Sequence, residues 1–79
     1  MRLLDLKTDE AVDQAIIYLT PTEARQLAAY LAELLADPDD NHRHLQDDTF
    51  QRELTIAVYT DSNRRFLDER SRHLLETGD

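Results

Sequence analysis

The clearest pattern of polar and apolar residues along the chain lies between positions 20 and 36. Thr20 is a good helix N-cap, Pro21 suits the first helical position, and Glu23 completes a capping box three residues after the cap. At the other end, Pro38 disfavours helical geometry at the residue before it. These signals predict a helix over about residues 21–36.

Within this predicted helix, apolar residues recur at intervals of three and four. Such spacing places them on one face and predicts that this face packs against the rest of the protein. The residues on that face are Ala24, Leu27, Ala28, Leu31, Leu34 and Leu35. We expect Leu27, Leu31 and one of the pair Leu34 and Leu35 to be buried, which makes this helix the main packing element.

The residues before the helix predict two strands. Residues 1–7 alternate in a way that fits an edge strand. Residues 8–13 are ambiguous, because Val12 and the apolar residues after it would also line a helix. Residues 14–19 are rich in β-branched and aromatic side chains, which favours a strand there.

After the helix, the acidic residues 37–41 are typical of a loop, and residues 42–46 fit a short strand. Residues 50–60 alternate apolar and polar side chains with period two, so a longer strand is expected there. In such a strand Arg52 lies on the same face as Phe50 and Leu54 and so points toward the core, where it would need an acidic partner such as Glu23 or Glu33. A second helix is predicted over about residues 63–77, capped by Asp61 or Ser62.

The predicted order is therefore β-β-α-β-β-α, in one α+β domain that spans residues 1–79. We expect a small, mostly antiparallel sheet of three to four strands, covered by the main helix and a C-terminal helix. A chain of 79 residues has a small core, whose net stability is roughly 3–5 kcal/mol. Association with a second copy would add to this small margin.

The composition of the chain limits the kinds of molecule that it is expected to bind. The formal net charge is −8, and such a surface repels phosphate backbones, so we expect no nucleic-acid partner. The sequence contains no apolar run long enough for a membrane helix and no cysteine, and its start does not fit a secretory signal. We expect a cytoplasmic protein that binds no membrane, while its acidity would suit a basic protein partner.

Two histidines form the one pattern typical of a metal site. His42 and His44 are separated by one residue, so a strand would place both imidazoles on one side, as zinc or nickel binding requires. The sequence does not indicate a third ligand, and a pair of histidines in a polar stretch is also typical of an ordinary surface. A metal-binding protein is therefore an alternative interpretation.

A possible interface comes from the sheet face that the main helix is not expected to cover. Strand parity places Ile16, Tyr18 and Tyr59 on that face, and Phe66 lies on the predicted C-terminal helix. That helix could cover the face, or the face could bind another chain. We predict a homodimer interface formed by these four residues, because tyrosine buries its ring and still presents a hydroxyl group.

The sequence gives no template for an enzyme. Its single glycine excludes a glycine-rich phosphate loop, and its two serines lack the surroundings of a catalytic nucleophile. We expect no cofactor and no enzymatic activity. The leading hypothesis is a small acidic protein-interaction module, an inhibitor or regulator of a basic protein. A ligand-sensing module with its site at a dimer seam is a further alternative.

Overall fold

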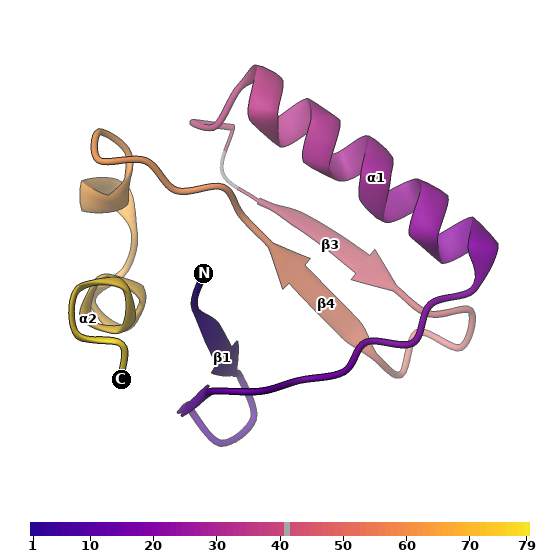
Figure 1. Cartoon of the computed structure of the whole chain (residues 1–79), viewed down its shortest axis with the longest axis horizontal. Coiled ribbons are helices and arrows are strands. Elements are labelled where there is room, and N and C mark those ends of the chain that lie inside the picture. The colour runs from indigo at the N-terminus through magenta and orange to yellow at the C-terminus, as the bar shows by residue number, and fades with distance from the viewer. Residues whose placement is uncertain (41) are drawn as a thin grey trace. The chain divides into compact units, whose positions relative to one another are not determined.

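The computed structural model describes residues 1–40 and 42–79, so Asn41, at the end of the predicted loop, lies outside the described residues. The elements, in chain order, are β1 (Leu3–Asp5), β2 (Glu10–Val12), α1 (Pro21–Ala36), β3 (Arg43–Gln46), β4 (Glu53–Ile56), the 3-10 helix η1 (Arg64–Phe66) and α2 (Glu69–Thr77) (Figure 1). The predicted α+β class and the order β-β-α-β-β-α are confirmed.

The four strands pair as two antiparallel two-stranded sheets. In the first, β1 pairs with β2, with Leu4 opposite Ala11. In the second, β3 pairs with β4, with Leu45 opposite Leu54. Each of these strands therefore has one edge that the other strand of its sheet does not cover.

The chain divides into two compact units. Unit 1 consists of Met1–Ile17 and Arg64–Asp79, and thus contains β1, β2, η1 and α2. Unit 2 is the continuous segment Tyr18–Asn63, with α1, β3 and β4. The single domain expected over residues 1–79 stays a prediction.

Helix α1 begins and ends where the sequence predicts. The backbone N–H of Glu23 donates to the Thr20 hydroxyl over 3.2 Å, and the Glu23 carboxylate accepts from the Thr20 N–H over 2.9 Å. These two bonds complete the capping box. The last helical residue is Ala36, two positions before Pro38.

The buried side of α1 differs from the predicted face. Leu34 is fully buried, as expected, but Leu27 is only half-buried and Leu31 is 41% exposed. Tyr30, which the predicted face excludes, is half-buried in its place. Apolar residues occupy more than half of the helix circumference, so their spacing alone does not fix which side packs. The prediction that Leu31 is buried is therefore wrong.

Unit 2 has its core where α1 packs against β3 (Figure 1). The buried apolar side chains of these two elements are Leu34 and Leu45. On β4 and just after it, Leu54, Ile56 and Val58 are half-buried and the residues between them are exposed. The predicted alternation is thus present, although the ladder covers Glu53–Ile56 instead of residues 50–60.

Asn63 joins two segments of unit 2 through its buried side chain. Its amide nitrogen donates to the carbonyl oxygens of Pro38 and Val58, each over 3.1 Å. Its carbonyl oxygen accepts from the Thr60 N–H over 2.7 Å. The loop after α1 and the chain after β4 are therefore held together by one polar residue.

Unit 1 combines the β1–β2 hairpin with α2. The Arg2 guanidinium donates to the carbonyl oxygen of Leu74 over 3.3 Å, and Leu74 is buried. Arg70 donates to the carbonyl oxygen of Asp9 over 2.9 Å and to its carboxylate over 3.2 Å. In the hairpin turn, the N–H groups of Lys7 and Thr8 donate to the Asp5 carboxylate and lower its pKa.

The predicted second helix begins later than expected. Asp68, not Asp61 or Ser62, is the N-cap of α2, and its carboxylate accepts from the Ser71 N–H over 2.7 Å. This hydrogen bond lowers the pKa of Asp68. Gly78 follows α2 in a left-handed conformation, with φ of 84°, and its N–H donates to the carbonyl oxygen of Leu74. Glycine is favoured at this position after a helix.

The strand predicted over residues 14–19 is wrong. The structure places β2 earlier, at Glu10–Val12, within the stretch that the sequence left ambiguous. Residues 14–19 have no regular secondary structure and join the hairpin to α1. Their β-branched residues favour extended backbone, but a strand also needs a partner, and the described chain gives them none.

Candidate protein-binding surface

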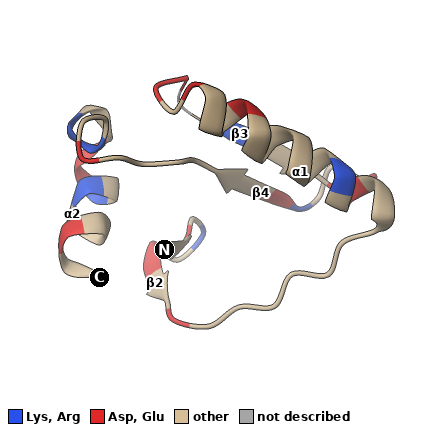
Figure 2. Cartoon of the chain, turned by 45° about the horizontal axis from the view of Figure 1, so that its top comes forward, with Lys and Arg blue, Asp and Glu red and all other residues tan. Residues whose placement is uncertain are grey.

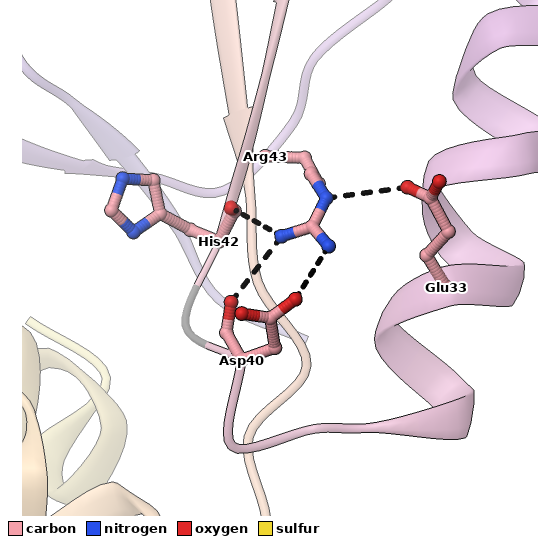
Figure 3. A network of polar contacts seen from close by, with 4 residues as sticks. All are labelled: Glu33, Asp40, His42 and Arg43. Carbon is pink, nitrogen blue, oxygen red and sulfur yellow. Dashed lines mark hydrogen bonds and ion pairs between the residues drawn. The ribbon is translucent and has the colours of Figure 1, made fainter.

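Arg43, at the start of β3, holds the end of α1 against the sheet. Its guanidinium donates to the Glu33 carboxylate over 3.2 Å and to the Asp40 carboxylate over 2.7 Å (Figure 3). It also donates to the carbonyl oxygens of Asp40 and His42. The hydrogen bonds that Arg43 donates to the carboxylates of Asp40 and, to a smaller extent, Glu33 raise its pKa. Sequence reasoning missed this residue, which is saturated with partners and thus serves the structure of unit 2.

The two histidines lie close together, as their spacing predicts. The ring centroids of His42 and His44 are 4.6 Å apart with the rings nearly perpendicular. Figure 3 shows the His42 ring on the opposite side of the strand from the Arg43 guanidinium. The His44 Nδ1 lies 3.0 Å from the Thr55 hydroxyl and 3.0 Å from a carboxylate oxygen of Glu53 on β4.

The neighbouring strand supplies partners for one ring nitrogen of His44. Its Nδ1 already faces two oxygen atoms of the neighbouring strand. Over residues 1–40 and 42–79, no group of three or more His, Cys, Asp or Glu side chains is arranged to hold a metal ion. The metal site at His42 and His44 stays a prediction, and we build no function on it.

The loop between β3 and β4 is organised by Asp47. One of its carboxylate oxygens accepts from the N–H groups of Gln51 and Arg52 and from the Thr49 hydroxyl, over 3.0 to 3.3 Å. The Phe50 N–H donates to the Asp47 carbonyl oxygen over 3.0 Å. Desolvation raises the pKa of Asp47, but these donors together hold that pKa below its ordinary value.

Phe50 is the unusual residue of this loop. Its φ of 57° is left-handed, a conformation that costs a bulky side chain about 1–2 kcal/mol. Its ring is 76% exposed. The prediction that the strand begins at residue 50 is therefore wrong, and the loop instead presents an aromatic ring to solvent. We call residues 47–52 the Phe50 loop.

Arg52 also differs from its prediction. Its side chain is exposed and lies 3.6 Å from the Asp47 carboxylate, not from Glu23 or Glu33. The expectation that Arg52 points toward the core assumed that it lies within the strand, but β4 begins at Glu53. The Phe50 loop thus carries two acidic residues, one arginine paired to the first of them, and an exposed ring.

The four predicted interface residues are all exposed. Ile16 and Tyr18 lie on the unpaired segment at 75% and 88% exposure, and Tyr59 follows β4. Phe66 lies on η1, where the Arg65 guanidinium stacks 4.8 Å above its ring. Since residues 14–19 form no strand, the shared sheet face predicted for Ile16, Tyr18 and Tyr59 is not present in the chain. Their role as an interface stays a prediction.

Acidic charge is concentrated in unit 2. Its 46 residues, Tyr18–Asn63, carry nine acidic and three basic residues, a net charge of −6 out of the −8 of the whole chain. Unit 1 carries eight acidic and six basic residues, a net charge of −2. Figure 2 shows acidic positions on α1 and on the loop that follows it. Unit 2 is therefore the part that would attract a basic protein.

Acid is expected to destabilise the fold through three carboxylates. Asp5, Asp47 and Asp68 each have a lowered pKa in the folded chain. Their stabilising contribution is present above their unfolded pKa and is lost as pH falls through the lower folded value, that is, from about pH 4 downward. Urea midpoints measured from pH 6 to pH 2 should fall over this window.

The matched control replaces the three residues with asparagine, which keeps a side-chain oxygen acceptor and cannot titrate. Its urea midpoint should fall less steeply below pH 4 than that of the unsubstituted chain. An equal slope in both proteins would contradict the assignment.

The described residues contain no helix that is both long and apolar enough to span a membrane. Comparison of the chain with protein-family models, with curated proteins and with solved structures gives no match.

Proposed function

We propose that this chain is a non-enzymatic, cytoplasmic protein-interaction module that binds and regulates a basic protein through unit 2. The observation that carries this proposal is the Phe50 loop. Its exposed aromatic ring, in a strained backbone conformation in the β3–β4 loop of the acidic unit, destabilises the folded chain and adds nothing to the core. Such strain is typical of a residue that serves binding.

The chemistry of this loop suits a protein partner. Aromatic side chains are enriched among the residues that dominate binding energy at interfaces. Here the ring is held by a loop whose backbone is fixed by Asp47, so little ordering is needed on binding. Asp48, beside it, is exposed and has no basic partner among the described ion pairs. A pocket flanked by lysine or arginine would complement both groups.

The charge of unit 2 supports a basic partner in particular. Its net charge of −6 would accelerate encounter with a positively charged surface, and this attraction weakens as salt concentration rises. Arg43 and Arg52 are already paired with acidic side chains within the unit. Little positive charge therefore remains to oppose such an encounter.

The test removes the ring without removing the loop. Asparagine tolerates the left-handed conformation, so Phe50→Asn should leave the free energy of unfolding unchanged or raise it by up to about 1 kcal/mol. The same substitution should weaken binding to the basic partner at least about tenfold, because it deletes the aromatic contact. Urea unfolding measures the first effect, and calorimetry with the purified partner measures the second.

The partner is first found by capture from a native cell extract, with the unsubstituted chain and Phe50→Asn compared side by side. Leu35→Asn is the matched control, since Leu35 is also exposed but lies on α1. A basic protein retained by the chain and by Leu35→Asn, and lost with Phe50→Asn, supports the proposal. Equal retention by all three proteins, or a partner that is not basic, would overturn it.

A further inference from the structure

The segment between the β1–β2 hairpin and α1 is extended, apolar and unpaired. Within the described residues, no backbone hydrogen bond involves residues 14–19. Ile16 and Tyr18 point their side chains into solvent, and Ile17, between them, is also exposed. The backbone N–H and C=O groups of the segment are thus free to pair with a strand, and side chains on both of its faces are exposed.

The same chain contains a free strand edge of matching character. β4 pairs with β3 on one edge alone, which leaves its other edge unpaired in unit 2. From Leu54 to Thr60 the chain carries no charge for seven residues, and its apolar side chains alternate. Residues 14–20 are likewise uncharged over seven residues.

This match matters because two copies of a chain with a net charge of −8 repel each other. They approach at the lowest electrostatic cost where neither copy carries charge. Outside helix α1, residues 14–20 and 54–60 are the longest uncharged stretches of the sequence. Pairing one with the other therefore brings together the surfaces that repel least.

We propose that residues 14–19 form an intermolecular strand, which pairs with the free edge of β4 in a second copy of the chain. The exchange is reciprocal, so it closes a twofold dimer in which each two-stranded β3–β4 sheet gains a third strand. The side chains of the segment alternate between two faces, and both faces carry apolar residues. Whichever residues pair, the side chains on one face therefore lie beside the half-buried side chains of β4, and those on the other face lie beside Tyr59.

A second copy is the chosen occupant because a single chain leaves both the segment and the edge unpaired. This inference is independent of the basic partner, since it is tested with the purified chain alone. Sedimentation equilibrium from about 1 μM to 1 mM should show a transition from 9.2 kDa to twice that mass.

Proline substitutions test the strand itself. Proline has no N–H to donate to a ladder, and of two successive residues one must direct its N–H toward the partner. At about 1 μM, where the chain is expected to be monomeric, Ile17→Pro and Tyr18→Pro should leave the circular dichroism spectrum unchanged, because neither N–H donates to another backbone group among the described residues. At least one of them should raise the dimer dissociation constant by tenfold or more. The control Leu35→Asp, at an exposed apolar position on α1, should leave the dissociation constant unchanged.

A second measurement on the unsubstituted chain identifies the contact directly. In a mixture of isotope-labelled and unlabelled chains, intermolecular nuclear Overhauser effects should join residues 14–19 of one copy to residues 54–60 of the other. A mass of 9.2 kDa throughout, dimerisation insensitive to both proline substitutions, or a dimer without these signals would each overturn the proposal. So would pairing of the two stretches within a single chain.

Discussion

Leu34→Ala is expected to unfold much of unit 2. Leu34 is fully buried, and its replacement truncates the one buried side chain of α1. Such a substitution costs about 2–5 kcal/mol, from lost burial and from the cavity left behind. A protein of this size has roughly 3–5 kcal/mol of net stability, so the cost takes most of that margin. Urea unfolding followed by circular dichroism measures the loss.

The neighbouring residue gives the matched control. Leu35→Ala makes the same chemical change one position later, where the side chain is 69% exposed. It should change the free energy of unfolding by less than about 1 kcal/mol, because alanine also favours the helix and little burial is lost. Equal losses from the two substitutions would show that the buried side of α1 is assigned incorrectly.

Asn63→Ala is expected to have the second largest effect. The substitution leaves the carbonyl oxygens of Pro38 and Val58 and the N–H of Thr60 without their side-chain partner. Unsatisfied polar groups in a buried site cost about 1–3 kcal/mol each, and partial access of water reduces the sum, so we expect a loss on the order of 2–4 kcal/mol. The urea midpoint should fall with no change in the spectrum of the folded chain.

Two further variants separate the contributions. Asn63→Asp retains the oxygen that accepts from Thr60 but loses the two amide donors, so it should be nearly as destabilising as alanine. Ser62→Ala, at the exposed position before it, removes only the exposed hydrogen bond between the Ser62 and Thr60 hydroxyls and should cost less than about 1 kcal/mol. A stable Asn63→Asp variant would mean that the two donated hydrogen bonds contribute little.

Sequence reasoning succeeded where structure is determined by neighbouring residues. The bounds of α1 follow from Thr20, Glu23 and Pro38, all of which act within one helical turn of the end they define. The α+β class and element order were likewise predictable. The side of α1 that packs was not, because Leu31 and Leu34 are equally apolar and the choice depends on where β3 lies.

The remaining differences depend on contacts distant in sequence. Residues 14–19 have strand propensity, but within the described residues they pair with no strand of the same chain. Asn63 looks like a simple strand breaker, although its partner Pro38 lies 25 residues away. For the candidate binding loop, nothing in the sequence indicated the left-handed backbone of Phe50.

The division of the chain into a continuous and a discontinuous unit sets an order of folding. Unit 2 closes through neighbouring elements, whereas Arg2 reaches Leu74 and Asp9 reaches Arg70 across 72 and 61 residues. Closing long loops costs more entropy, and contacts of this kind form slowly. During synthesis, residues 18–63 also leave the ribosome before residues 64–79. We therefore expect unit 2 to fold while the β1–β2 hairpin still lacks its contacts with α2. Unit 1 is then the later of the two units to form.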